Sequence, residues 1–260
     1  MDALLRCLRD RTPMDHPAAL VVAHPDDETI AAGGSLHLLP RLLLVHVTDG
    51  APRDGQDAAS HGFPNPDAYA AAREAELAAA LALAGTNPDR AALGIADQDA
   101  SLHIPAIAAR LAQLFCQHGV RHVLTHAYEG GHPDHDAVAL AVHLAARNGP
   151  AVLEFAGYHA APDGSLRTGR FLPGPPGHGI GLSGADAERK AAMLRCFHTQ
   201  ATILGHFSKD REAFRPAPDY DFTVPPHPGL LNYEHWGWTM TGERWRGLAA
   251  AALDRPCCAA

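Results

Sequence analysis

The feature that most constrains the fold is the alternation of short apolar runs with longer amphipathic runs through the first 158 residues. The short runs are rich in Val, Leu and Ala and are bounded by turn residues, which predicts buried strands at 18–23, 41–50, 92–97, 122–127 and 151–158. The longer runs predict helices at 67–85, 104–119 and 134–149. Strands and helices that alternate in this way form right-handed β-α-β units. We therefore predict an α/β, Rossmann-like three-layer fold with a mostly parallel sheet.

The chain changes character after residue 160. Residues 160–184 are rich in Gly and Pro and predict a long loop or flap near the active site. Helices are predicted at 185–197, with Ser183 as the cap, and at 242–254, and the segment between them is irregular and aromatic. We predict a single domain over 1–260, with a core at about 18–158 and an irregular C-terminal addition, the flap and helices of 159–260.

Bulk composition excludes several classes of protein. The chain is 47% hydrophobic and 19% charged, which is ordinary for a globular protein. Its formal net charge of −8, without a cluster of Lys or Arg, argues against a nucleic-acid partner. No apolar run reaches the ~18 residues of a membrane span, and the N-terminus lacks a secretory pattern, so we expect a cytoplasmic protein. The five cysteines, including the adjacent Cys257 and Cys258, show no metal or redox spacing.

Residues 23–28, with the sequence AHPDDE, follow the first predicted strand and begin a helix. Pro25 suits the first helical position, and His24 is then the predicted cap. The acidic residues that follow lie at the positive end of the helix, where they are common for capping alone. His24 and Asp27 are three residues apart and can point at one ion, which leaves Asp26 on the vacant side.

A second segment, GGHPDHD at 130–136, follows the strand predicted at 122–127 and repeats the order of His, Pro, acid and helix. His132 and His135 are again three residues apart. Ligands of open α/β sheets bind beyond the carboxyl ends of the strands, so both segments should converge in one crevice. Two imidazoles and one carboxylate leave the fourth position of a tetrahedral zinc for water, which is typical of catalytic sites.

Together, AHPDDE and HPDHD resemble the LmbE-like (PIG-L) family of zinc-dependent N-deacetylases, which act on N-acetylglucosaminyl compounds. The resemblance covers about residues 18–146, with weaker similarity to 200 and beyond. It implies a Zn²⁺ ion, or another divalent transition metal, held by His24, Asp27 and His135. It also implies that Asp26 is the general base.

The resemblance implies further roles on the same residues of the family motifs. His132 would polarise the carbonyl or protonate the leaving amine, and Asp134 would buttress it. Arg73 matches a family arginine that contacts substrate, and Asp97, on a looser match, would lie near the sugar. Some members carry a tyrosine two residues before the second motif, where it helps to hold the oxyanion.

The tyrosine position is Gly130 in this chain. The nearest tyrosine is Tyr128, and the sequence leaves open whether it takes that role.

The chemistry that this arrangement implies is hydrolysis of an amide. Zinc lowers the pKa of a bound water from near 16 to about 7. Asp26 would accept the proton of the attacking water, zinc and His132 would stabilise the oxyanion, and His132 held by Asp134 would protonate the amine. We therefore predict a zinc-dependent hydrolase that removes an N-acetyl group from a small N-acetylglucosamine-like sugar or glycoconjugate.

Three other functions compete with this prediction. A zinc amidase that cuts a larger acyl group from a sugar or thiol-sugar conjugate stays open, because the pocket lining depends on loops. A non-catalytic metal- or sugar-binding protein would need neither Asp26 nor His132. Gly179, Gly181 and Gly184 satisfy the dinucleotide fingerprint G-x-G-x-x-G, but no strand is predicted before them, which disfavours a nicotinamide-dependent oxidoreductase. The sequence leaves homo-oligomerisation open.

Overall fold

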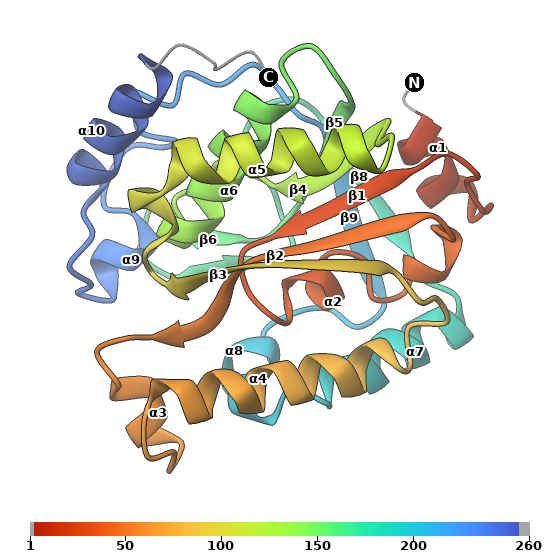
Figure 1. The fold of residues 1–260 in the computed structure, drawn as a ribbon, viewed down its shortest axis with the longest axis horizontal. Coiled ribbons are helices and arrows are strands. Elements are labelled where there is room, and N and C mark those ends of the chain that lie inside the picture. The colour runs from red at the N-terminus through yellow and green to blue at the C-terminus, as the bar shows by residue number, and fades with distance from the viewer. Residues whose placement is uncertain (1–2, 255–260) are drawn as a thin grey trace.

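The computed structural model, which describes residues 3–254, is built on a seven-stranded sheet in the order β3-β2-β1-β4-β5-β9-β8 (Figure 1). Five strands are parallel: β1 (Ala18–Val22), β2 (Leu42–Pro52), β3 (Asp89–Asp97), β4 (His122–His126) and β5 (Ala151–Phe155). Two antiparallel strands extend the sheet beyond β5, namely β9 (Arg211–Pro216) and β8 (His178–Gly181). The predicted α/β fold with a mostly parallel sheet is confirmed.

Helices cover both faces of the sheet (Figure 1). One layer holds α5 (Ile104–Gln117), α6 (Pro133–Ala145) and α10 (Gly242–Leu253). The other holds α2 (Asp27–Ala32), α3 (Gln56–Ser60), α4 (Pro66–Leu81), α7 (Gly184–Leu194) and α8 (Ala201–Leu204). The remaining elements are α1 (Ala3–Asp10), α9 (Asn232–His235), a hairpin of β6 (Tyr158–Ala160) and β7 (Leu166–Thr168), and the 3₁₀ turns Leu36–Leu38, Ala100–Leu102 and His198–Gln200.

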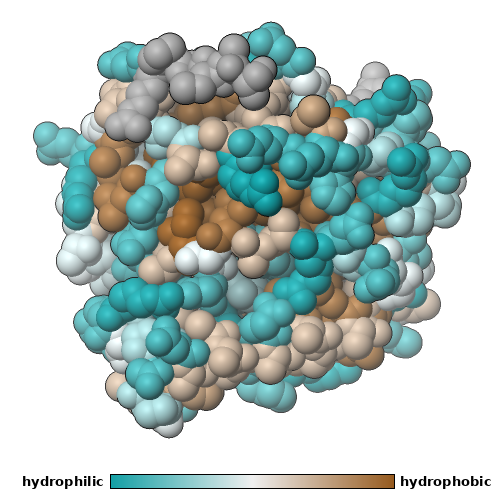
Figure 2. All heavy atoms as spheres, in the orientation of Figure 1, coloured by the Kyte–Doolittle hydropathy of each residue, from teal (hydrophilic) through white to brown (hydrophobic). Residues whose placement is uncertain are grey.

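The apolar strands divide their side chains between two cores. Leu20 and Val22 of β1 pack with the layer of α2, α4 and α7, whereas Ala19 and Val21 pack with α5, α6 and α10. Every residue of β1 is buried, because helices cover both faces of a parallel sheet. Figure 2 shows apolar surface gathered between α5 and α4, where the edge strand β3 lies, and polar side chains over much of the rest of this face.

The C-terminal part contains more regular structure than the sequence predicted. The segment predicted as a flap, 160–184, holds β7 and the edge strand β8. β9 lies in the segment predicted to be irregular, since short strands that pair antiparallel give little periodicity. No helix within residues 3–254 is both long and apolar enough to cross a membrane. Cys257 and Cys258 lie outside the described residues.

The glycine-rich run does not follow a strand as the dinucleotide fingerprint requires, because Gly179 and Gly181 lie within β8 itself and Gly184 begins α7. β8 leads directly into α7, whose N-terminus is capped by Ser183 as predicted. Asp186 in the first turn accepts hydrogen bonds from Arg11 (2.7 Å) and Arg189 (2.7 Å). A carboxylate of the chain itself therefore lies where a bound phosphate would be needed.

Candidate metal centre and active site

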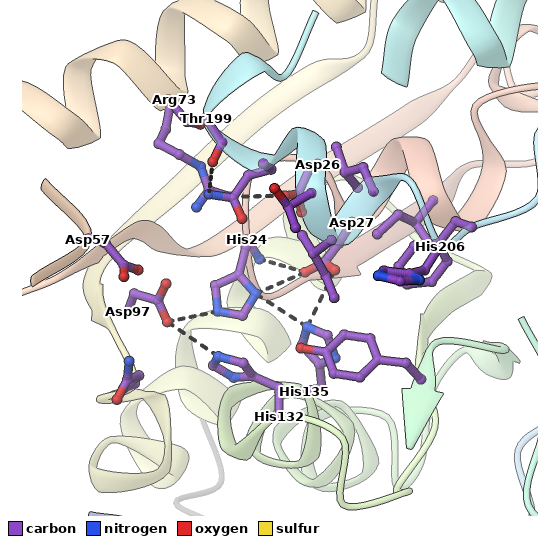
Figure 3. Close-up of a pocket in the computed structure, with 18 of the residues that line it drawn as sticks. His24, Asp26, Asp27, Asp57, Arg73, Asp97, His132, His135, Thr199 and His206 are labelled. Carbon is purple, nitrogen blue, oxygen red and sulfur yellow. Dashed lines mark hydrogen bonds and ion pairs between the residues drawn. The ribbon is translucent and has the colours of Figure 1, made fainter. Parts of the chain in front are cut away.

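The two sequence motifs meet at the carboxyl ends of the parallel strands (Figure 3). The segment from the end of β1 into α2 supplies His24, Asp26 and Asp27, and the start of α6 supplies His132, its cap, and His135 in its first turn. These side chains line a cavity of about 370 Å³. The convergence follows from strand direction, because parallel neighbours end at one edge of the sheet.

Three side chains form a compact set of donors, which we call the ligand triangle: His24, Asp27 and His135. The Nδ1 atom of His24 lies 3.2 Å from Asp27 Oδ2 and 3.2 Å from His135 Nε2. His135 Nε2 lies 3.3 Å from Asp27 Oδ1. Ligand atoms about 2.1 Å from a tetrahedral zinc are separated by roughly 3.4 Å, so each pair lies near the separation that such an ion requires, with one oxygen of Asp27 facing each ring.

The other ring nitrogen of His24 faces two carboxylates. Its Nε2 lies 3.2 Å from Asp97 Oδ1 and 3.3 Å from Asp134 Oδ2. Metal-binding histidines commonly donate their second N–H to a carboxylate, which fixes the tautomer and the ring orientation. Asp97, which the resemblance placed beside the sugar, thus contacts a candidate ligand directly.

Asp134 is placed differently from the expectation that it holds His132. Its Oδ2 also accepts from the backbone N–H of Gln98 (2.7 Å), and its Oδ1 accepts from that of Ala100 (3.0 Å). His132 turns the other way, because its Nδ1 caps α6 by accepting from the backbone N–H of Asp134 (3.1 Å). Asp134 therefore braces His24 and the turn after β3.

The cap on α6 fixes the tautomer of His132. Since Nδ1 accepts a hydrogen bond, the ring proton lies on Nε2, which is 3.5 Å from Asp97 Oδ1. Burial, together with His24 and His135 nearby, holds the pKa of His132 well below its usual value. His132 is thus a neutral imidazole that offers an N–H to the cavity.

Asp26, the predicted base, occupies an unusual backbone conformation. It is the N-terminal flanking residue of α2, in place of the predicted His24, and has φ 130° and ψ −29° without a side-chain cap bond. Such a conformation in a residue other than glycine costs on the order of 1–3 kcal/mol and persists only when surrounding contacts enforce it. Burial raises the pKa of Asp26 well above its usual value, and the charge of Arg73 opposes that shift.

Arg73 is used by the protein itself. Its side chain is only 4% exposed, and its terminal nitrogens donate to Gly50 O (2.9 Å), Pro25 O (2.7 Å) and Asp26 Oδ2 (3.1 Å). The resemblance implied a contact with substrate, whereas these contacts are with the backbone and with Asp26. Arg73 lines the cavity, but both of its terminal nitrogens bond to the protein itself.

The sequence did not single out two further residues of the site, His126 and Tyr158. His126 stacks on His135 with ring centroids 4.0 Å apart, and its Nε2 accepts from the backbone N–H of Ala23 (3.0 Å). Burial lowers the pKa of His126 to about 3, so it is a neutral support. The sequence could have indicated His126 as a site residue, because it lies at the end of the strand predicted at 122–127, just before the second motif.

Tyr158 contacts His135 edge to face at 5.2 Å between ring centroids and lines the cavity. A Cβ atom at Gly131 would lie 1.9 Å from the carbonyl oxygen of Tyr158, so only glycine lets β6 approach the second motif. Tyr128 instead donates to Val224 O (2.9 Å) and stacks on Trp245. The hydroxyl of Tyr128 is therefore committed outside the cavity.

The cavity has a polar side and an apolar side. Figure 3 shows Asp57 beside Asp97 at one end and His206 at the other, with the ligand triangle between them. Ile203, Phe207 and Trp236 line the apolar side. The segment predicted as a flap, 160–184, contributes no residue to the lining of the cavity. The C-terminal residues that line it come from segments 199–207 and 236–238.

Comparisons with known proteins agree with the motif. Residues 19–146 match the family described as PIG-L, GlcNAc-PI de-N-acetylase. No curated protein sequence matches the chain. Among solved structures, the A40926 pseudoaglycone deacetylase is similar with a TM-score of 0.60 and 18% identity, covering 80% of this chain and 99% of its own.

Two other solved structures show how widely the fold is used. The N,N'-diacetylchitobiose deacetylase of Pyrococcus horikoshii has a TM-score of 0.56 and 16% identity, over 83% of this chain and 92% of its own. The 4-carboxy-2-hydroxymuconate hydratase of Pseudomonas putida has a TM-score of 0.55 and 17% identity, over 79% and 98%. At these identities the likeness shows the fold, and the reaction must be argued from the site.

Proposed function

Because this chain belongs to the PIG-L family, we propose that it is a zinc-dependent hydrolase that removes an N-acetyl group from an N-acetylglucosamine-like sugar or its conjugate. The observation that carries the proposal is the ligand triangle of His24, Asp27 and His135, with separations of 3.2–3.3 Å, next to Asp26 in one cavity. A protein that only bound metal or sugar would have no need of a buried carboxyl group held beside the ligands.

The donor set suits a zinc-type ion. Two imidazole nitrogens and one carboxylate leave a position for water or substrate, as in catalytic zinc sites. A divalent ion held by these residues would supply Lewis-acid chemistry, activating water and polarising the acyl oxygen. Asp134 and Asp97 orient His24 for this task through its Nε2 atom.

Asp26 carries the proton in the proposed reaction. It accepts a proton from water as the water attacks the acyl carbon. The amine that leaves must then be protonated. His132 has its only ring proton on Nε2 and meets a backbone N–H at Nδ1, so losing that proton would leave an anionic ring. Asp26 therefore returns the proton to the amine.

His132 serves as a hydrogen-bond donor in this scheme. Its neutral Nε2–H is available to the oxygen on which charge develops. A donor of this kind contributes roughly 3–4 kcal/mol to the transition state. Tyr158, which lines the cavity beside His135, is the second candidate donor in place of the tyrosine that some family members carry at the position of Gly130.

The polar and apolar sides of the cavity are compatible with two kinds of substrate, which differ in the size of the acyl group. Asp57 and Asp97 offer acceptors to the hydroxyls of a sugar ring, which must be paired when buried. The apolar side formed by Ile203, Phe207 and Trp236 favours the second candidate function, hydrolysis of a larger acyl group. Each buried methylene contributes about 0.8 kcal/mol, so the two functions predict opposite trends with chain length.

The test is amine release from N-acylated glucosamines and their glycosides with acyl groups of two, four and six carbons. The proposal expects the acetyl compounds to be cleaved best, with activity lost to a chelator and restored by zinc. Rates that rise about fourfold with each methylene would assign the larger-acyl function instead. Release of no amine from any compound would overturn both.

A further inference from the structure

The side chain of Arg73 ties together two segments that end at the cavity. It extends from α4, and its terminal nitrogens bond to Pro25 O at the end of β1 and to Gly50 O in β2. The same guanidinium contacts the carboxylate of Asp26 at 3.1 Å. A planar group with several fixed donors can hold three acceptors in one arrangement, which a flexible ammonium cannot do.

The backbone of Asp26 is enforced from both sides. On one side its N–H donates to Glu28 Oε2 (3.0 Å), and its carbonyl accepts from the N–H groups of Thr29 (3.0 Å) and Ile30 (3.0 Å). On the other side stands Arg73, which holds the preceding carbonyl and the carboxylate. At φ 130° this residue would relax without such contacts.

The sequence makes room for this arrangement at Gly50. Its φ of +68° favours glycine, and a Cβ atom would lie 2.8 Å from Arg73 Cζ and 3.0 Å from Nη1. The same Cβ atom would lie 3.0 Å from Pro25 Cδ, so a side chain at position 50 would press on the guanidinium and on the proline that precedes Asp26. The glycine and the arginine act as one unit.

We propose that Arg73 is a positioning residue that acts through Asp26 and makes no productive contact with substrate. This inference rests on the proposed function, because Asp26 is there the proton carrier. It departs from the substrate contact that the family resemblance implies. Arg73 keeps the carboxylate of Asp26 aimed at the cavity in a conformation that the chain would otherwise leave.

The first test is a kinetic comparison of Arg73→Met with the unchanged protein on the best substrate of the acyl panel. Displacing a reacting group by about 1 Å costs around 100-fold, so we expect kcat to fall about 100-fold with KM within about twofold. Arg73→Lys, which keeps the charge but not the fork, should recover part of that loss. A contact with substrate would raise KM and leave kcat unchanged, which would overturn the inference.

A second pair of variants tests the unit of Gly50 and Arg73. Gly50→Ala should lower kcat as Arg73→Met does. Gly119→Ala is the matched control, since Gly119 has φ +59° and no atom within 4 Å of the added Cβ. Both variants carry the penalty of a left-handed alanine, and only the first displaces the guanidinium. Equal kcat values in the two would contradict the proposal.

The third readout does not depend on turnover. Hydrogen exchange of the Thr29 and Ile30 amides, which bond to the Asp26 carbonyl, should rise at least tenfold in Arg73→Met and stay unchanged in Gly119→Ala. If no amide in the panel is cleaved and exchange still rises, the proposed function fails and the positioning role stands. If amides are cleaved and neither exchange nor kcat changes in Arg73→Met, only the positioning role fails.

Discussion

Replacing Asp134 with asparagine separates two arrangements of the site. In the structure Asp134 supports His24, a candidate ligand, and the family resemblance would have it support His132, a candidate donor. Loss of an outer carboxylate from a metal-bound histidine commonly costs 10- to 100-fold in metal affinity. Asp97 remains 3.2 Å from the same His24 nitrogen, so we expect the lower end, about tenfold or 1.4 kcal/mol.

The measurement is zinc affinity by competition with a chromophoric chelator. The amide side chain in Asp134→Asn would keep one oxygen for the N–H of Gln98 or Ala100 and lose the other, so the unfolding temperature should be recorded alongside. The matched control is His132→Gln, which should keep full affinity. Unchanged zinc affinity in Asp134→Asn, together with a large loss of kcat, would refute the reasoning. It would indicate that Asp134 supports His132 and not His24.

The same contacts give four further predictions. His135→Ala should lose the metal, about one ion per chain by elemental analysis, along with activity. Asp26→Asn should keep the metal and lose roughly 10²–10⁴ in turnover; loss of zinc there would make it a ligand. Tyr158→Phe should lower kcat at least tenfold, and Tyr128→Phe, whose hydroxyl bonds to a backbone carbonyl, should not. Burial raises the pKa of Glu129 from 4.5 to about 8, so the folded state retains a proton that the unfolded chain releases between those values. The contribution of Glu129 to the free energy of unfolding should therefore fall as pH rises from 5 to 8, by at most about 1.4 kcal/mol per unit, and denaturation of Glu129→Gln should show a shallower decline with pH.

The fold and the proximity of His24, Asp27 and His135 could be predicted because both depend on strong, local signals. Buried strands such as 18–23 are continuous apolar runs, and parallel strands leave their carboxyl ends at one edge. A histidine and an acid placed just after two such strands must therefore meet. The structure brings His24, Asp27 and His135 within 3.2–3.3 Å of one another.

Roles that depend on side-chain direction could not be predicted from spacing. Asp134 is two residues from His132, yet the capping of α6 turns the ring and the carboxylate apart. The position of Arg73 on an amphipathic helix predicts a charge exposed to solvent. Only the folded chain shows that Arg73 donates hydrogen bonds to the backbone carbonyls of Pro25 and Gly50. Tyr158 enters the site because Gly131 permits a close approach, which is a tertiary effect without a sequence period.

A fold shared by deacetylases and a hydratase must take its reaction from the side chains in the cavity. Both reactions need a base for water, but hydration returns a proton to a carbon atom, whereas amide hydrolysis returns it to the amine that leaves. Burial raises the pKa of Asp26, which favours the protonated carboxyl, and Arg73 lowers it, which favours the carboxylate. In the proposed reaction Asp26 would take the proton in the first step and return it in the second, and the buried guanidinium would fix where Asp26 stands through both.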